Sequence, residues 1–256
     1  VYQMTAQRGG RDRTFLKRVF TKLLLNFTWW VNRTDTKGKN LFSGGFLGLD
    51  NIGVFDRSAP LPKGGSLQQA DATAWMAFYC TTMLSMALEL ASEEEEYEDL
   101  ASKFFEHFIA ISAAINHFGG TGLWDQLDGF YYDQLEIENQ NIPLRARSLV
   151  GIIPMLVVEV LGDDLVNRLP GFKKRLEWFI ANKPELAKQL ASSQQLWAQR
   201  NHPASATEPI GQKLLAIPST ERLSRLLRYV LDSNEFLSPH GIRSLSKIHA
   251  DFPYRL

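Results

Sequence analysis

Residues 33–66 separate two helical stretches and follow neither a helical nor a strand-like periodicity. The segment is rich in Gly, Pro, Asn and Asp, which favour turns. Irregular segments of this length in compact proteins are usually either functional or disordered. Large apolar residues are frequent here, which argues against disorder. The chain must therefore fold so that helices support a long, ordered loop.

Apolar residues spaced by three and four predict helices on both sides of this loop. Helices are expected over Asp12–Val31, Leu67–Ser92, Tyr97–Asn116, Pro143–Leu161, Phe172–Asn182, Glu185–Gln199 and Ser219–Leu231. Short strands are expected only around Phe130–Leu135 and near the C-terminus. Strongly apolar helices need cover on all sides, whereas amphipathic ones lie outside them. The pattern predicts an all-α fold, a toroid of helical hairpins with the long loops gathered at one end.

Composition restricts the partners that the chain can have. Lys plus Arg and Asp plus Glu number 28 each, so no net charge favours nucleic acid or an anionic membrane. We see no run of about 18 apolar residues, and we expect no membrane span. The single cysteine, Cys80, is expected to be buried, and residues 1–14 do not resemble a secretory signal. A cytoplasmic location is the resulting expectation.

Asp50 lies in a glycine-rich stretch, residues 42–57, between large apolar residues. Desolvation there would raise the pKa of its carboxyl group and let it act as a general acid. Gly and Asp also mark ordinary turns, and this stretch alone leaves both interpretations open. Asp56 is a second candidate acid. The adjacent Arg57 would favour the ionised form of Asp56, so Asp50 is preferred.

Three irregular stretches combine aromatic residues and glycine with carboxylates or arginine: Phe42–Arg57, Leu123–Asp133 and Phe236–Ser246. Aromatic faces and polar side chains that meet in a concave site suit a sugar ligand. The candidate substrate-binding residues are Phe46, Gly48, Leu49, Asn51, Asp56, Arg57, Asp71, Trp75, Trp124 and Asp125. Other interpretations stay open, since Asp71 could simply stabilise a helix start and Asp125 could belong to a turn. No histidine lies in a paired metal-ligand spacing and no phosphate-binding glycine motif is present, so we expect no metal or cofactor.

Several short motifs occur in a fixed order along the chain. They are Asn26–Val31, Gly44–Ser58 with the central Gly48-Leu-Asp-Asn51, Asp71–Met76, Gly122–Asp125, Gly129–Asp133, Arg147–Gly151 and Ser238–Ser244. On these motifs the chain resembles glycoside hydrolase family 63, the processing α-glucosidases and mannosylglycerate hydrolases. The resemblance spans most of residues 14–256 and is strongest over 24–160.

The resemblance implies a six-hairpin (α/α)6 toroid that hydrolyses an α-glucosidic or related short glycoside bond with inversion. It places the general acid at Asp50. It also implies that Asn51, Arg57 and Trp124 belong to motifs that line the sugar pocket. The general base of the family is a glutamate in an aromatic Asn-Pro context, which is not found before Leu256. We therefore expect residues 1–256 to form one incomplete toroid domain, truncated at its C-terminus, with the base beyond residue 256 and little activity of its own.

The alternative is a non-catalytic helical toroid that binds carbohydrate or a protein partner. The missing base favours this alternative. The sequence leaves the sugar, the linkage and the oligomeric state open.

Overall fold

The computed structural model describes residues 2–32, 38, 40–44, 49, 51–57, 59, 61, 65–116, 122–138, 140–183 and 212–256. The helices are α1 (Tyr2–Ala6), α2 (Arg13–Val31), α3 (Ala70–Ala91), α4 (Glu96–Ile115), α5 (Asp163–Asn167), α6 (Pro170–Asn182), α8 (Thr220–Val230) and α9 (Ile248–Asp251), with 3-10 turns η2 (Leu149–Gly151) and η3 (Ile153–Leu156). The strands are β1 (Ser66–Gln68), β2 (Trp124–Asp125), β3 (Phe130–Tyr131), β4 (Asp133–Ile137), β5 (Gln140–Leu144), β6 (Val158–Gly162), β7 (Gln212–Ala216), β8 (Leu237–Ser238) and β9 (Gly241–Ile242).

The predicted all-α toroid is wrong. About 52% of the described residues are helical and 17% lie in strands, which form four small antiparallel sheets. The fold is therefore mixed α/β. The largest sheet, in the order β1–β4–β5, arises where residues 133–144 alternate polar and apolar side chains around a turn. A repeat of two residues is typical of a strand with one buried face, whereas an amphipathic helix repeats every 3.6 residues.

The helix predicted over Pro143–Leu161 is also wrong. The segment instead contains the end of β5, the turns η2 and η3, and most of β6. A continuous apolar run does not distinguish a buried helix from a buried strand. Here Gly151 and Pro154 interrupt the run, and the β-branched Val157, Val158 and Val160 favour an extended backbone.

Periodicity predicts the other helices well. The helices expected over 12–31, 97–116, 172–182 and 219–231 are confirmed to within two residues as α2, α4, α6 and α8. Helix α3 begins three residues later than predicted, because Ser66–Gln68 pairs with β4 as a strand. The strands expected around 130–135 are confirmed as β3 and β4. The strands nearest the C-terminus, β8 and β9, lie within Phe236–Ser246, which was expected to be irregular, and residues 252–256 contain no strand. The helix predicted over 185–199 lies outside the described residues.

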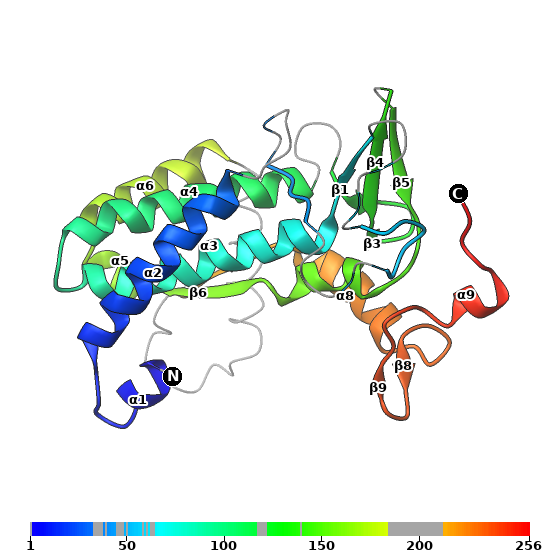
Figure 1. Ribbon diagram of the computed structural model, residues 1–256. Helices are drawn as coiled ribbons and strands as arrows, with labels where there is room; N and C mark the ends of the chain where they lie inside the picture. The colour runs from blue at the N-terminus through cyan, green and yellow to red at the C-terminus, as the bar shows by residue number, and fades with distance from the viewer. Residues whose placement is uncertain are drawn as a thin grey trace. The chain divides into compact units, whose positions relative to one another are not determined.

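The chain divides into two compact units, of which the first comprises Val1–Asn32, Tyr79–Phe108 and Glu159–Leu214. Its core is built from aromatic edge-to-face contacts. Phe27 of α2 packs against Phe104 of α4 with ring centroids 5.0 Å apart, and Phe105 packs against Phe172 of α6 at 5.7 Å. These contacts fix α2 and α6 on α4, and the three helices are labelled in Figure 1. Cys80 is fully buried, as predicted.

The second unit comprises Arg33–Phe78, Ile109–Val158 and Leu215–Leu256. Its largest sheet contains β1, β4 and β5, which are labelled in Figure 1. Leu67 of β1 lies opposite Leu135 of β4, which in turn lies opposite Ile142 of β5. With Leu144 these residues form a small hydrophobic cluster, which Val54, Phe55 and Leu61 of the long loop cover. These described residues of the loop are thus packed on the sheet by apolar burial.

In the described part of the chain one helix, α3, is long and apolar enough to cross a membrane. This is weak evidence for a membrane span, because 61% of its most apolar stretch is buried inside the protein. The core helix of a globular domain has the same character.

The aromatic core of the first unit gives a testable expectation. Phe27→Ala should lower the free energy of unfolding by about 3–5 kcal/mol, because it opens a cavity at a side chain only 1% exposed. Leu25→Ala on the same helix is the control. Leu25 is 73% exposed, so this change should cost less than about 0.5 kcal/mol. Urea denaturation of both variants measures the difference, and equal losses would contradict the packing described.

Candidate functional site

A buried arginine forms the centre of the candidate site. Arg57, 7% exposed, directs its guanidinium between Asp71, in the first turn of α3, and Asp133, at the start of β4. Its Nη1 donates to Asp71 Oδ2 at 3.1 Å and its Nη2 donates to Asp71 Oδ1. Its Nε donates to Asp133 Oδ2 at 2.8 Å and its Nη2 to Asp133 Oδ1 at 3.3 Å. The planar guanidinium therefore forms a bidentate pair with each of the two carboxylates.

The start of α3 provides the frame for this cluster. Asp133 Oδ1 accepts from the backbone N–H of Ala70 at 2.9 Å, so a carboxylate from β4 binds one of the N–H groups that a helix start leaves without an intrahelical partner. Asp71 Oδ1 accepts from the N–H of Ala72, also at 2.9 Å. Gln69 Nε2 donates to the carbonyl of Arg57 at 3.1 Å, which fixes the loop backbone beside the helix.

The start of α3 and Arg57 also bind loop residues that precede Asp50 in the sequence. Arg57 Nη1 donates to the carbonyl oxygen of Leu49 at 3.1 Å, and Gln69 Oε1 accepts from the N–H of Gly44 at 2.9 Å. Both ends of the stretch 44–57 are thereby tied to the start of α3. Asp50, the predicted general acid, lies outside the described residues, as do Phe46 and Gly48. Asn51 and Asp56 are exposed.

The charges of the cluster do not balance. Burial and the neighbouring charge of Asp71 raise the pKa of Asp133 to about 6, although Arg57 and the Ala70 N–H act in the opposite direction. Burial would lower the pKa of Arg57, but the two carboxylates outweigh it and the pKa lies above its usual value. One guanidinium cannot neutralise two buried carboxylates, so the cluster can take up a proton in mildly acidic solution.

A small cavity adjoins the cluster. It measures about 20 Å³ and lies between loop residues 52–57 and the sheet, with Arg57 and Asp133 among its lining residues. Its other walls are largely apolar, formed by Val54, Phe55 and Leu144 among others. A space of this size holds about one water molecule or one hydroxyl group.

The residues predicted to bind substrate around Trp124 have structural partners. Trp124 is 7% exposed, contacts Tyr131 edge to face at 4.8 Å, and lies under the guanidinium of Arg222 at 4.9 Å. Asp125 Oδ1 accepts from the N–H groups of Leu127 and Asp128 at 2.9 and 3.0 Å. The turn interpretation of Asp125 is therefore confirmed. Trp75 of α3 is half-buried and contacts Phe78 edge to face.

The same turn fixes the electrostatics of Asp125. Burial acts to raise its pKa, but the backbone N–H groups and Arg145, whose Nε donates at 2.9 Å, lower it below the usual value. Asp125 is therefore ionised at neutral pH and unsuited to donate a proton. The turn ends at Gly129, whose φ of +70° suits glycine.

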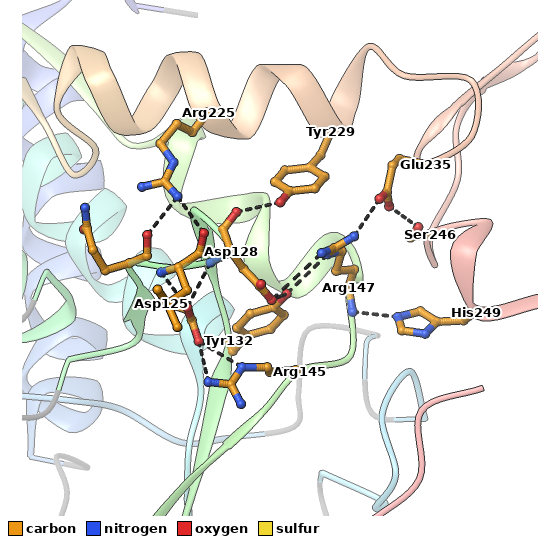
Figure 2. Close-up of polar contacts among 12 residues, drawn as sticks. Asp125, Asp128, Tyr132, Arg145, Arg147, Arg225, Tyr229, Glu235, Ser246 and His249 are labelled. Carbon is orange, nitrogen blue, oxygen red and sulfur yellow. Dashed lines mark hydrogen bonds and ion pairs between the residues drawn. The ribbon is translucent and has the colours of Figure 1, made fainter. Parts of the chain in front are cut away.

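A second polar network, centred on Arg147, was not predicted. Arg147 Nη1 donates to Glu235 Oε1 at 2.6 Å, and its guanidinium lies over the ring of Tyr229 at 4.7 Å (Figure 2). Ser246 donates to the other oxygen of Glu235, and the Arg147 backbone N–H donates to His249 Nε2 at 2.9 Å. The network joins segments about 90 residues apart in sequence, which neither spacing nor periodicity could show.

Comparison with known proteins gives relatives without an assigned activity. No family model matches the chain. An uncharacterized protein of Saccharomyces cerevisiae is 49% identical over 259 residues, which cover 96% of this chain and 23% of the yeast protein. An uncharacterized protein of Borreliella burgdorferi is 27% identical over 161 residues, covering 60% of this chain and 28% of that protein. The chain thus spans about a quarter of the length of these relatives.

The raised pKa of Asp133 predicts a pH effect with a definite sign. Between its usual value of 3.8 and about 6, the folded state binds more protons at this carboxyl than the unfolded state. The contribution of Asp133 to stability is therefore full below pH 3.8 and falls by about 3 kcal/mol as the pH rises through 6.

Asp133→Asn removes this titration, so the measurement is the difference in unfolding free energy between wild type and variant at several pH values. From pH 4 to pH 7, the unfolding free energy of the wild type should fall relative to that of Asp133→Asn. Asp251→Asn makes the same substitution at an exposed position of α9 and is measured as the control. A flat difference for Asp133→Asn would mean that the Asp133 carboxyl does not take up the proton.

Proposed function

We propose that this chain is part of an inverting glycoside hydrolase similar to family 63, with Asp50 as its general acid. The substrate would be an α-glucoside or a related short glycoside. The observation that supports this most is the hydrogen bond from the buried Arg57 to the Leu49 carbonyl, at 3.1 Å. It ties the residue next to Asp50 to an ionic cluster of two carboxylates.

In the proposed reaction, the carboxyl group of Asp50 gives its proton to the glycosidic oxygen as the bond to the anomeric carbon breaks. A water molecule attacks that carbon from the opposite face of the sugar and loses a proton to a carboxylate base. Acid and base of inverting enzymes stand roughly 6.5–9.5 Å apart to admit the water. The base would be a glutamate outside these 256 residues, so the activity of the whole protein is part of the proposal.

Arg57 is a positioning residue in this proposal. It binds Leu49 and Asp71 with the same Nη1 atom, which fixes the loop backbone relative to the start of α3. The uncompensated negative charge of the Asp71–Asp133 pair would favour the protonated form of a nearby carboxyl group. The cluster would thus both place the acid and help it keep its proton at neutral pH.

A carbohydrate-binding protein without catalysis is the second candidate. The observation in its favour is that the carboxylates of Asp71, Asp125 and Asp133 all accept hydrogen bonds from other groups of the protein. None of these three carboxylates is then available as a catalytic group.

Asp50→Asn in the full-length natural protein distinguishes the two functions. Enzyme and variant are incubated with α-linked glucosyl disaccharides, and NMR follows the anomer released. The wild type should release the β-anomer, and the variant should lose about 10²–10⁴-fold in kcat with nearly unchanged affinity for the sugar. The asparagine keeps the size of the side chain but has no proton to give.

Asp99→Asn is the matched control, because it makes the same change of charge at an exposed position in the first turn of α4. It should leave kcat unchanged. Equal turnover by wild type and Asp50→Asn would rule out Asp50 as the acid. Sugar binding without turnover by the wild type would favour the binding protein.

A further inference from the structure

The sheet β1–β4–β5 has two faces of different character. One face carries the hydrophobic cluster of Leu67, Leu135 and Leu144. Because side chains alternate along a strand, the opposite face carries Gln68, Gln134 and Glu136 together with their neighbours on β5. A second sheet face with such residues is normally exposed to water. Here Gln68 is only 2% exposed and Gln134 only 9%.

This polar face collects buried oxygens that accept no hydrogen bond. Among the described residues, the buried side-chain nitrogen and oxygen atoms without a partner are Gln68 Oε1, Gln134 Oε1 and Asn141 Oδ1. All three are amide oxygens, and all three lie on this one face. A buried acceptor without a partner costs about 1–3 kcal/mol. The three acceptors therefore gather this cost on one face of a three-stranded sheet.

The strand register brings the three side chains together. Gln68 and Gln134 are direct cross-strand partners, and Asn141 lies diagonally from Gln134, opposite Glu136. Direct partners have Cβ atoms about 4.5–5.5 Å apart, and diagonal ones are within reach of long side chains. Gln68 Nε2 donates to Glu136 Oε2 at 3.1 Å. This bond fixes the amide of Gln68, since the reversed orientation would place its oxygen against a carboxylate.

We propose that this polar face binds a hard cation of the size of Ca²⁺ through the three amide oxygens, with Glu136 adding negative charge. Ca²⁺ accepts neutral carbonyl oxygens of Asn and Gln together with carboxylates, in a flexible geometry with bonds of about 2.3–2.6 Å. Oxygens on neighbouring strands suit such bonds to one shared ion. Mg²⁺ fits less well, because it demands a regular octahedron and retains its water.

A sugar or another organic ligand does not suit this face. The three unpartnered atoms are all acceptors, which suits a cation, whereas a hydroxylated ring presents acceptor lone pairs of its own as well as donors. The described chain has no group of three or more His, Cys, Asp or Glu residues that could hold a metal. The proposed site therefore differs from a site built of acidic residues or histidines. Its ligands are mainly neutral carbonyl oxygens, a ligand type that hard cations accept. It is also independent of the proposed glycosidase activity.

The test is Ca²⁺ binding by the full-length natural protein after removal of metals with EDTA, measured by calorimetric titration with CaCl₂. Gln134→Met and Asn141→Leu each replace one amide oxygen by an apolar group of similar size. Each should weaken one Ca²⁺ site at least about tenfold. Gln140→Met is the control, because Gln140 is exposed and neighbours Asn141 on the other face of β5. It should bind Ca²⁺ like the wild type.

Thermal unfolding in EDTA separates loss of the site from loss of the fold. Without cation, both variants should melt at or above the temperature of the wild type, because each removes an unsatisfied acceptor. With Ca²⁺ only the wild type and Gln140→Met should gain stability from this site. Identical Ca²⁺ stoichiometry and affinity in all four proteins would overturn the proposal, as would the absence of Ca²⁺ binding by the wild type.

Discussion

The guanidinium of Arg57 joins the long loop, the start of α3 and the start of β4. It binds Asp71 and Asp133, 14 and 76 residues away, and the Leu49 carbonyl of its own loop. Two buried carboxylates that face each other without this cation would repel each other and draw in protons. The long loop would also lose its attachment to the start of α3. The candidate site, the start of the helix and the attachment of the loop all depend on this one side chain.

The sheet β1–β4–β5 connects this cluster with the proposed cation site. Asp133 and Leu135 belong to one face of β4, where the loop packs and the small cavity lies. Gln134 belongs to the other face, where the amide oxygens gather. Adjacent residues of one strand would thus serve two different ligands. A cation on one face would stabilise the pairing of β4 that also positions Asp133.

Sequence periodicity predicts the parts of the fold whose signal is local. The amphipathic helices α2, α4 and α8 follow from their apolar spacing. The turn at Asp125 is one of the two interpretations that the local sequence allows. The all-α prediction is wrong because the apolar run over 143–161 is compatible with a buried helix as well as with buried strands, and because the strand pairing around residues 133–144 depends on contacts with β1. The sequence also predicts Arg57 as a candidate site residue, but its role depends on Asp133. That contact is set by strand register, which one sequence does not reveal.

A double-mutant cycle on Arg57 and Asp133 tests the central claim most directly. The unfolding free energy is measured for wild type, Arg57→Met, Asp133→Asn and the double variant. Removing Arg57 alone should cost about 3–5 kcal/mol, because it leaves buried charge uncompensated. The loss should be smaller in the Asp133→Asn background, with a coupling of about 2 kcal/mol or more. Losses that add to within about 0.5 kcal/mol would show that the two side chains act independently and would contradict the account.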